Sequence, residues 1–173
     1  QNTLGVSAVH PVPPEIVGAQ IRAVLDDIGA DAIKIGMLGD IATIDAVADA
    51  LTGVSMPIVL DPVMVAKGGA ALLADDAAGA LVARLLPVAA VVTPNVPELA
   101  VLTGAEAGDE VDMLLAAQEL LGQGPAAVLA KGGHLPGDRV GRVDAGIGLA
   151  VRADVMGEVA ARAQQHAHAR ILR

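Results

Sequence analysis

Polar side chains follow three apolar segments of this sequence, each of which stops beside Gly or Pro. Asp61 and Lys131 each end one segment, Thr93 and Asn95 end another, and Glu98 follows three residues later. Carboxylates suit Mg²⁺, which proteins usually hold through one or two of them together with water and phosphate. A lysine beside glycines offers a point charge where the backbone can approach a phosphate closely. These residue types are therefore candidates for phosphoryl chemistry with a divalent metal.

The same residues also have structural interpretations. Asp61 can cap a turn, Glu98 can compensate the N-terminus of a helix, and Lys131 with its two glycines can form an ordinary turn. Spacing alone favours these structural roles over the metal and phosphate roles.

Apolar strands that alternate with amphipathic helices must position these side chains. Strands separated by helices of this length indicate βαβ units and a parallel sheet, and near-continuous apolar strands indicate helices on both faces. Because the carboxyl ends of parallel strands share one edge, we expect the polar residues to meet there. The expected strands are 32–35, 57–61, 88–92 and 126–130, and the expected helices are 14–28, 41–51, 75–86, a short one from Pro97, and 109–121.

Composition excludes several classes of function. The 173 residues include no Cys, Phe, Tyr or Trp, so disulfides, thiolate metal sites, Cys or Tyr nucleophiles and aromatic stacking on bases are excluded. A net charge of −9 argues against nucleic-acid binding. Charges or turn residues interrupt every long apolar stretch, so we expect no membrane span. An acidic chain without cysteine or a visible signal peptide fits a cytoplasmic protein, which is the expected location.

Six motifs occur in one order along the sequence. They are Gln1-Asn2-Thr3-x-Gly5-Val6, Lys34-Ile35-Gly36-Met37-Leu38, Asp61-Pro62-Val63-Met64, Lys67-Gly68-Gly69, Thr93-Pro94-Asn95-x-Pro97-Glu98 and Lys131-Gly132-Gly133-His134. Together they resemble the hydroxymethylpyrimidine/phosphomethylpyrimidine kinases of thiamine biosynthesis, within the ribokinase-like superfamily. The resemblance covers residues 1–138 and implies an α/β three-layer sandwich with a mostly parallel central sheet, incomplete in this chain.

The resemblance implies roles around Mg-ATP for the residues of the first paragraph. Similar kinases use this Asp and the Asn-x-x-Glu motif around the nucleotide, so Asp61 and Glu98 become metal ligands, with Thr93 and Asn95 beside the ATP phosphates. Lys131 is implied to lie near the same phosphates. The cofactors implied are Mg²⁺ and ATP, the latter as co-substrate.

Two further residues are implied on the substrate side. Gln1 would contact the aminopyrimidine edge, since an amide both donates and accepts hydrogen bonds. Met37 would line the pocket, where a thioether can lie against a flat ring. Without the resemblance, a terminal Gln with no role and an ordinary core Met are favoured instead.

The implied function is ATP-dependent phosphorylation of hydroxymethylpyrimidine and then of its monophosphate, by a homodimer that binds neither nucleic acid nor membrane. The alternatives are a non-catalytic pyrimidine- or nucleotide-binding remnant and a pyridoxal kinase-like enzyme. The Gln-Asn-Thr opening and the Lys-Gly-Gly-His string favour the pyrimidine enzyme.

Residues 139–173 depart from the family pattern. They hold six basic and three acidic side chains, whereas residues 1–138 hold five and seventeen, and they show no obvious strand. The family's Gly-Thr-Gly-Cys or Gly-Thr-Gly-Asp motif, which supplies an anion hole and the catalytic base, does not occur there. We therefore assign no catalytic residue and expect a chain truncated at both ends, with impaired activity. A frameshift after about Asp138 explains the tail, and genuine divergence is the alternative.

Overall fold

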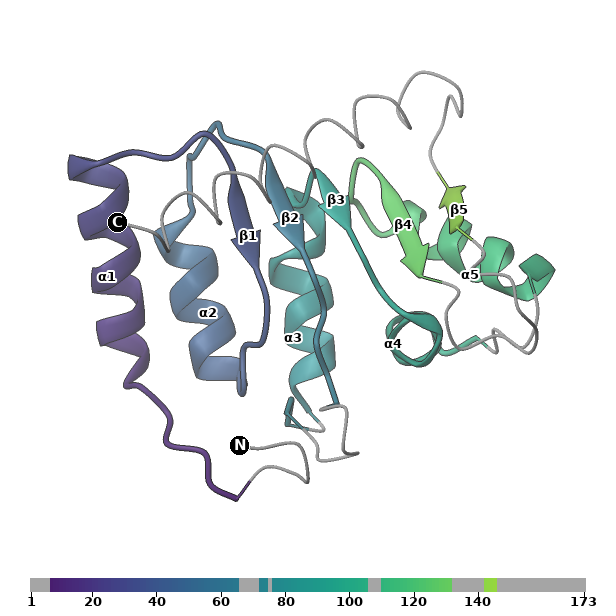
Figure 1. Cartoon of the computed structure of the whole chain (residues 1–173), viewed down its shortest axis with the longest axis horizontal. Helices are drawn as coiled ribbons and strands as arrows, with labels where there is room; N and C mark the ends of the chain where they lie inside the picture. The colour runs from purple at the N-terminus through teal and green to yellow at the C-terminus, as the bar shows by residue number, and fades with distance from the viewer. Residues whose placement is uncertain (1–6, 66–71, 75, 106–109, 132–141, 146–173) are drawn as a thin grey trace.

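The computed structural model describes residues 7–65, 72–74, 76–105, 110–131 and 142–145. Five strands form one sheet in the order β1-β2-β3-β4-β5 (Figure 1). Neighbouring strands from β1 to β4 are parallel, and β5 pairs antiparallel with β4. The strands are β1 Ile33–Ile35, β2 Ile58–Leu60, β3 Val91–Val92, β4 Val128–Lys131 and β5 Arg142–Ala145. The predicted α/β class with a mostly parallel sheet is confirmed.

The helices follow the predicted segments closely. They are α1 Pro14–Asp27, α2 Ile41–Ala50, α3 Ala77–Arg84, α4 Val96–Thr103 and α5 Glu110–Gly122. One boundary differs, because the segment Leu86–Val88 forms a 3₁₀ turn instead of the start of the third strand. Pro87 has no N–H to give to a strand ladder and suits the first turn of a helix, so β3 begins only at Val91.

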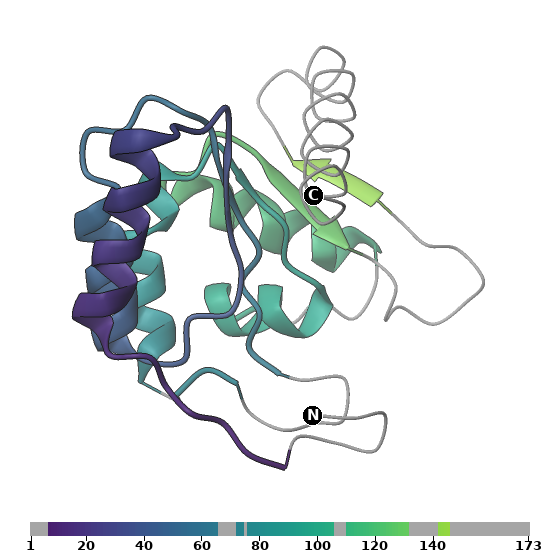
Figure 2. The ribbon, with the colours of Figure 1, turned by 60° about the vertical axis from the view of Figure 1, so that its left-hand side comes forward.

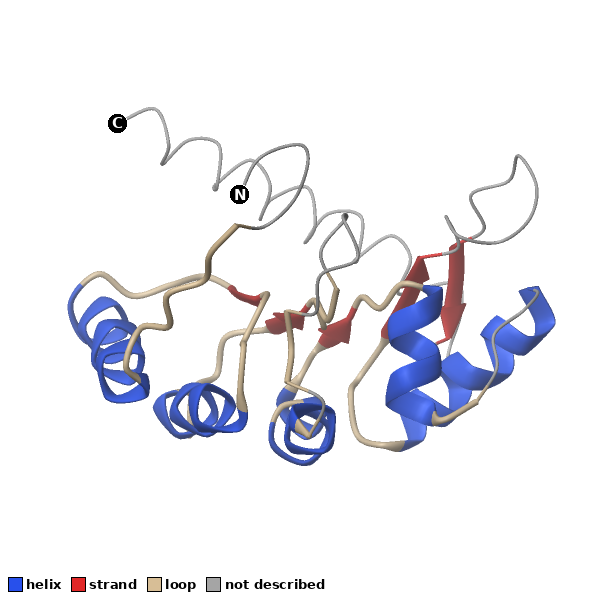
Figure 3. Cartoon of the chain, turned by 90° about the horizontal axis from the view of Figure 1, so that it is seen from below, coloured by secondary structure: helices blue, strands red, loops and turns tan. Residues whose placement is uncertain are grey.

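The described helices form one layer against one face of the sheet (Figure 3). The parallel strands lie side by side in chain order, and crossovers of the same hand between such strands place every helix on the same face. Figure 2 shows α1 beside α2 at one side of this layer. The expected helices on the second face are not found among the residues that the structure describes.

The hydrophobic core lies between the sheet and this helical layer, and aliphatic side chains build it. Alternate strand residues point into it, because successive side chains of a strand face opposite sides. The opposite face therefore carries Lys34, Val59 and Leu129, which are less buried than their neighbours. The strand residues of the core include Ile35, Leu60, Val92 and Val128, and the helices add Ile44, Val47, Leu81, Leu99, Met113 and Leu120.

The structure corrects the expectation for the start of the tail. Arg142–Ala145 forms β5, which pairs with β4 through the register Leu129↔Asp144 and Ala130↔Val143. A four-residue strand that alternates polar and apolar residues gives a weak sequence signal, and its pairing with β4 is a tertiary effect. The predicted division after residue 138 stays a prediction.

Within the part of the chain that the structure describes, no helix is long and apolar enough to cross a bilayer.

Candidate functional site

Asp61 stands at the carboxyl end of β2, on the sheet edge that we call the rim: the edge formed by the carboxyl ends of β1 to β4. Its backbone continues the ladder, since its N–H donates to the carbonyl of Ile35 at 2.8 Å. Its carbonyl accepts from the N–H of Val63 at 2.8 Å, which turns the chain away from the sheet. The carboxylate is thus held at the rim, where its side chain is 19% exposed.

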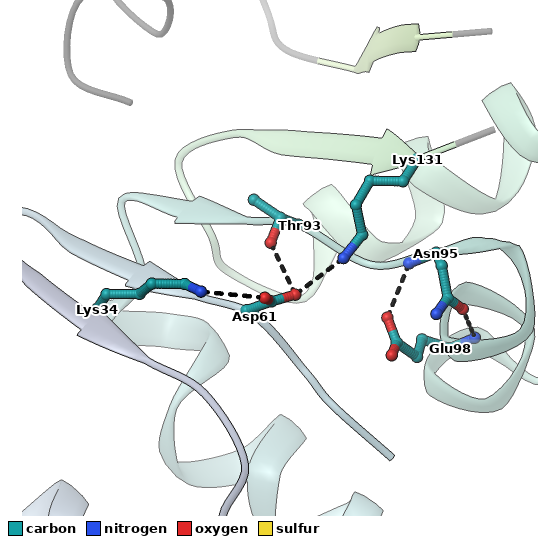
Figure 4. A network of polar contacts seen from close by, with 6 residues as sticks. All are labelled: Lys34, Asp61, Thr93, Asn95, Glu98 and Lys131. Atoms are coloured by element: carbon teal, nitrogen blue, oxygen red, sulfur yellow. Dashed lines mark hydrogen bonds and ion pairs between the residues drawn. The ribbon is translucent and has the colours of Figure 1, made fainter. Parts of the chain in front are cut away.

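Three side chains from three other strands meet this carboxylate (Figure 4). The ammonium of Lys131, the last residue of β4, donates to Oδ1 at 2.9 Å, and the hydroxyl of Thr93, just past β3, donates to the same oxygen at 3.1 Å. The ammonium of Lys34 in β1 donates to Oδ2 at 3.2 Å. The expectation that polar residues from the strand ends share one rim is confirmed for this group.

The surroundings of Asp61 favour its ionised form. Burial opposes ionisation, but the hydrogen bond and charge of Lys131, followed by those of Lys34, outweigh it and hold the pKa of Asp61 below its ordinary value. Two ammonium groups around one carboxylate leave one excess positive charge in the group formed by Lys34, Asp61 and Lys131. Such a site attracts an anion such as phosphate.

Asn95 and Glu98 form a capping box at the N-terminus of α4. The Asn95 Oδ1 accepts from the Glu98 backbone N–H at 2.9 Å, and Glu98 Oε2 accepts from the Asn95 backbone N–H at 2.8 Å. These contacts satisfy two backbone donors that the first turn would otherwise leave unpaired. The helix-terminus interpretation of Glu98 is therefore confirmed, and its side chain is buried, with a residue exposure of 6%. Its role as a metal ligand stays a prediction.

The start of α4 is attached to the rim through the backbone. The N–H of Lys131 donates to the carbonyl of Pro94 at 2.8 Å, and Asn95 and Lys131 form a parallel bridge. The capping box and the Lys131 ammonium therefore belong to one local structure. This is the side of the rim on which ATP binding is predicted.

Met37 follows β1 at the opposite side of the rim. It is 48% exposed, so the alternative that it is an ordinary core methionine is wrong. Gln1, the other predicted substrate-binding residue, lies outside the described residues, as do Lys67, Gly68 and His134. The sequence analysis gave no role to Lys34. A charged residue between two isoleucines of a short apolar strand is unusual, and this pattern could have marked Lys34 as a candidate for the site.

The residues present are compatible with Mg²⁺. The described residues contain no group of three or more His, Cys, Asp or Glu side chains that could hold a metal, but Mg²⁺ needs only one or two carboxylates when water and phosphate complete its shell. An ionised carboxylate offers about four acceptor positions. Lys34, Lys131 and Thr93 occupy three of those of Asp61, so an acceptor position remains for a cation.

The sequence of this chain matches one family of known proteins. The family model described as phosphomethylpyrimidine kinase matches residues 1–168. The hydroxymethylpyrimidine/phosphomethylpyrimidine kinase of Streptomyces coelicolor is 49% identical over 140 residues, which are 81% of this chain and 52% of that protein. The chain thus spans about half the length of this curated relative.

Solved structures agree with this match. The phosphomethylpyrimidine kinase of Clostridium difficile 630 superposes with a TM-score of 0.78 at 38% identity, over 86% of this chain and 64% of that one. An ADP complex of Bacillus subtilis pyridoxal kinase superposes with a TM-score of 0.72 at 33% identity, over 83% and 56%. At 38% and 33% identity, the two structures share sequence with this chain as well as its fold. The chain belongs to the phosphomethylpyrimidine kinase family.

Proposed function

We propose that this chain binds Mg-ATP and a hydroxymethylpyrimidine at the rim, as part of a kinase that phosphorylates the pyrimidine and then its monophosphate. The observation that carries the proposal is the convergence of Asp61, Thr93 and Lys131 from three strand ends. Family membership supplies the reaction class, and the rim supplies a positive anion-binding surface with a carboxylate in it. A cytoplasmic location and a homodimer remain predictions.

Each residue at the rim has a separate role in binding Mg-ATP. Lys131 approaches the ATP phosphates with an ammonium that has two N–H donors left after its contact with Asp61. Asp61, held ionised by its two lysines, and Glu98 are the carboxylates that would hold Mg²⁺. Thr93 fixes the orientation of the Asp61 carboxylate through its hydroxyl. The metal, when bound, offsets negative charge on the phosphates.

A hydroxymethylpyrimidine is favoured over pyridoxal as the acceptor. The curated pyrimidine kinase is 49% identical to the chain, whereas the pyridoxal kinase structure is 33% identical. Met37 stands exposed at the rim and can lie against either ring, so it does not separate the two substrates by itself.

Calorimetric titration of the 173-residue chain with Mg²⁺ and a non-hydrolysable ATP analogue tests the nucleotide side. We expect saturable binding that weakens about tenfold or more in Lys131→Gln, because a charge-assisted hydrogen bond contributes roughly 1.5–3 kcal/mol. Arg22→Gln removes the same charge from the exposed surface of α1 and should leave the affinity within about twofold. Equal affinities in all three proteins, or no binding at all, would refute the nucleotide assignment.

A second titration tests the acceptor. The wild-type chain should bind hydroxymethylpyrimidine more tightly than pyridoxal when each ligand is titrated in the same calorimetric experiment. Tighter binding of pyridoxal would overturn the choice of substrate while leaving the kinase class in place.

A further inference from the structure

Lys34 is a charged residue in the middle of an apolar strand. It stands level with Val59 in the β1–β2 register, on the sheet face opposite the helices, and its side chain is 64% exposed. Its ammonium reaches Oδ2 of Asp61 at 3.2 Å. An ion pair this exposed contributes at most about 1 kcal/mol to stability, so stability alone is a weak reason for a lysine at this position.

The two lysines approach Asp61 from opposite sides (Figure 4). Lys131 contacts Oδ1 and is joined through its backbone to Asn95 and the start of α4. Lys34 contacts Oδ2 and belongs to the β1 segment that continues to the exposed Met37. The carboxylate therefore separates two ammonium groups, one on the nucleotide side of the rim and one on the side proposed for the acceptor.

The Lys34 ammonium has donors to spare for a ligand. An ammonium carries three N–H donors, and the contact with Asp61 uses one of them. Since Lys131 offsets the Asp61 charge as well, the positive charge of Lys34 is only partly neutralised. A phosphate monoester, which carries a charge of about −1.5 to −2 at neutral pH, is the complementary ligand.

We propose that Lys34 binds the phosphate group of a phosphorylated acceptor, as a second anion-binding residue across Asp61 from Lys131. The inference rests on the proposed function, in which the product of the first transfer becomes the acceptor of the second. Lys34 then distinguishes the pyrimidine monophosphate from the unphosphorylated pyrimidine, because only the monophosphate presents an anion to it. Lys131 does not make this distinction, since it serves the nucleotide.

Titration of four versions of the 173-residue chain tests the assignment: wild type, Lys34→Gln, Lys34→Arg and the surface control Arg22→Gln. The probes are hydroxymethylpyrimidine, its monophosphate and the Mg²⁺ complex of the ATP analogue. Lys34→Gln should weaken binding of the monophosphate about tenfold or more, while the other two affinities change by less than about twofold. Lys34→Arg should restore most of the loss, because it keeps the positive charge, and Arg22→Gln should match wild type.

Two results would overturn the inference while the proposed function stands. In the first, Lys34→Gln binds the monophosphate as tightly as wild type does. In the second, all three affinities fall together, which means that Lys34 only holds Asp61 in place. If wild type binds neither pyrimidine, the proposed function fails and the inference with it. Circular dichroism melting of each variant separates a folding defect from a binding defect, and Lys34→Arg gives a second reading if Lys34→Gln does not fold.

Discussion

The Lys131 ammonium lies 2.9 Å from Oδ1 of Asp61, although 70 residues separate the two in the sequence. Their strands are not neighbours either, because β3 lies between β2 and β4. Thr93, at the end of β3, donates to the same carboxylate oxygen and fills the position between them. The contact therefore depends on the order of three strands. The sheet itself would thus position any ligand that Asp61 and Lys131 bind.

Asp61→Asn should reduce the contribution of Mg²⁺ to nucleotide binding. The amide keeps the shape of the side chain but loses the charge that attracts the metal, while Lys34 and Lys131 remain. We expect the ratio of ATP-analogue affinities with and without Mg²⁺ to fall about tenfold, and the metal-free affinity to rise slightly because the rim becomes more positive. Asp45→Asn, an exposed carboxylate of α2 that pairs with Arg84, is the control. An unchanged Mg²⁺ ratio in Asp61→Asn would show that Asp61 does not serve the metal.

Thr93→Val should destabilise the fold modestly. The substitution preserves the β-branched shape and removes the hydroxyl that donates to Asp61 at 3.1 Å, so the expected loss is about 0.5–1.5 kcal/mol in the free energy of unfolding. Thr52→Val removes an exposed hydroxyl after α2 and should change stability by less than about 0.5 kcal/mol. Urea denaturation compares the two variants. Equal losses would mean that the Thr93 hydroxyl contributes no more than an exposed one.

The positions of the strands and the meeting of Asp61, Thr93 and Lys131 were predictable from the sequence. Apolar runs mark parallel strands, and the geometry of a parallel sheet brings their carboxyl ends to one edge. The contact of Lys34 with Asp61 was not predictable, because it requires the register that sets Lys34 level with Val59. The apolar pattern of each strand indicates which side chains face the core, but which residues stand level across β1 and β2 follows from the packing of both strands and their helices.

Two other features also needed the structure. From the sequence, Glu98 could either cap the N-terminus of α4 or bind a metal. The capping-box contacts in the structure show that it caps the helix. The strand β5 was missed because four alternating residues carry little local preference and depend on β4 for their hydrogen bonds. The capping box is a local contact with a recognisable Asn-x-x-Glu spacing, so the structure had only to choose between two interpretations that the sequence already offered. The pairing of β5 with β4 is tertiary, and local sequence patterns leave it open.

Asp40→Ala should cost about 1 kcal/mol of stability, a typical value for the loss of an N-cap. Asp40 precedes α2, and its Oδ1 accepts from the backbone N–H of Thr43 at 2.8 Å. Asp40→Asn is the matched control, because asparagine caps helices about as well as aspartate does. Thermal unfolding at neutral pH should therefore rank wild type and Asp40→Asn together, above Asp40→Ala. An Asp40→Asn variant as unstable as Asp40→Ala would contradict the capping role.

The advantage of wild type over Asp40→Ala should also depend on pH. The hydrogen bonds from the Thr43 backbone and then its side chain lower the pKa of Asp40 in the folded state. A carboxyl group whose folded pKa is depressed contributes stability above its unfolded pKa, about 3.9, and loses that contribution as pH falls through the folded pKa. The stability difference between wild type and Asp40→Ala should thus shrink below about pH 4. The difference between Asp40→Asn and Asp40→Ala should stay constant, since neither side chain titrates.

Glu98→Gln should separate the capping role of Glu98 from its predicted metal role. Glutamine can take the same position in a capping box, so its amide oxygen can still accept from the Asn95 N–H, and we expect unfolding free energy within about 0.5 kcal/mol of wild type. Glu98→Ala, by contrast, loses the acceptor and leaves a buried donor unpaired, which should cost about 1–3 kcal/mol.

The Mg²⁺ dependence of ATP-analogue binding by Glu98→Gln then tests whether Glu98 is a metal ligand. If Glu98 holds Mg²⁺ as well as the helix terminus, Glu98→Gln keeps its fold but needs about tenfold more Mg²⁺ for half-maximal binding of the ATP analogue, since a neutral amide attracts the cation less than a carboxylate does. If the Mg²⁺ requirement is unchanged in a folded Glu98→Gln, the residue serves α4 alone. Asp61 would then be the carboxylate at the rim on which the metal depends, because one carboxylate with water and phosphate suffices for Mg²⁺.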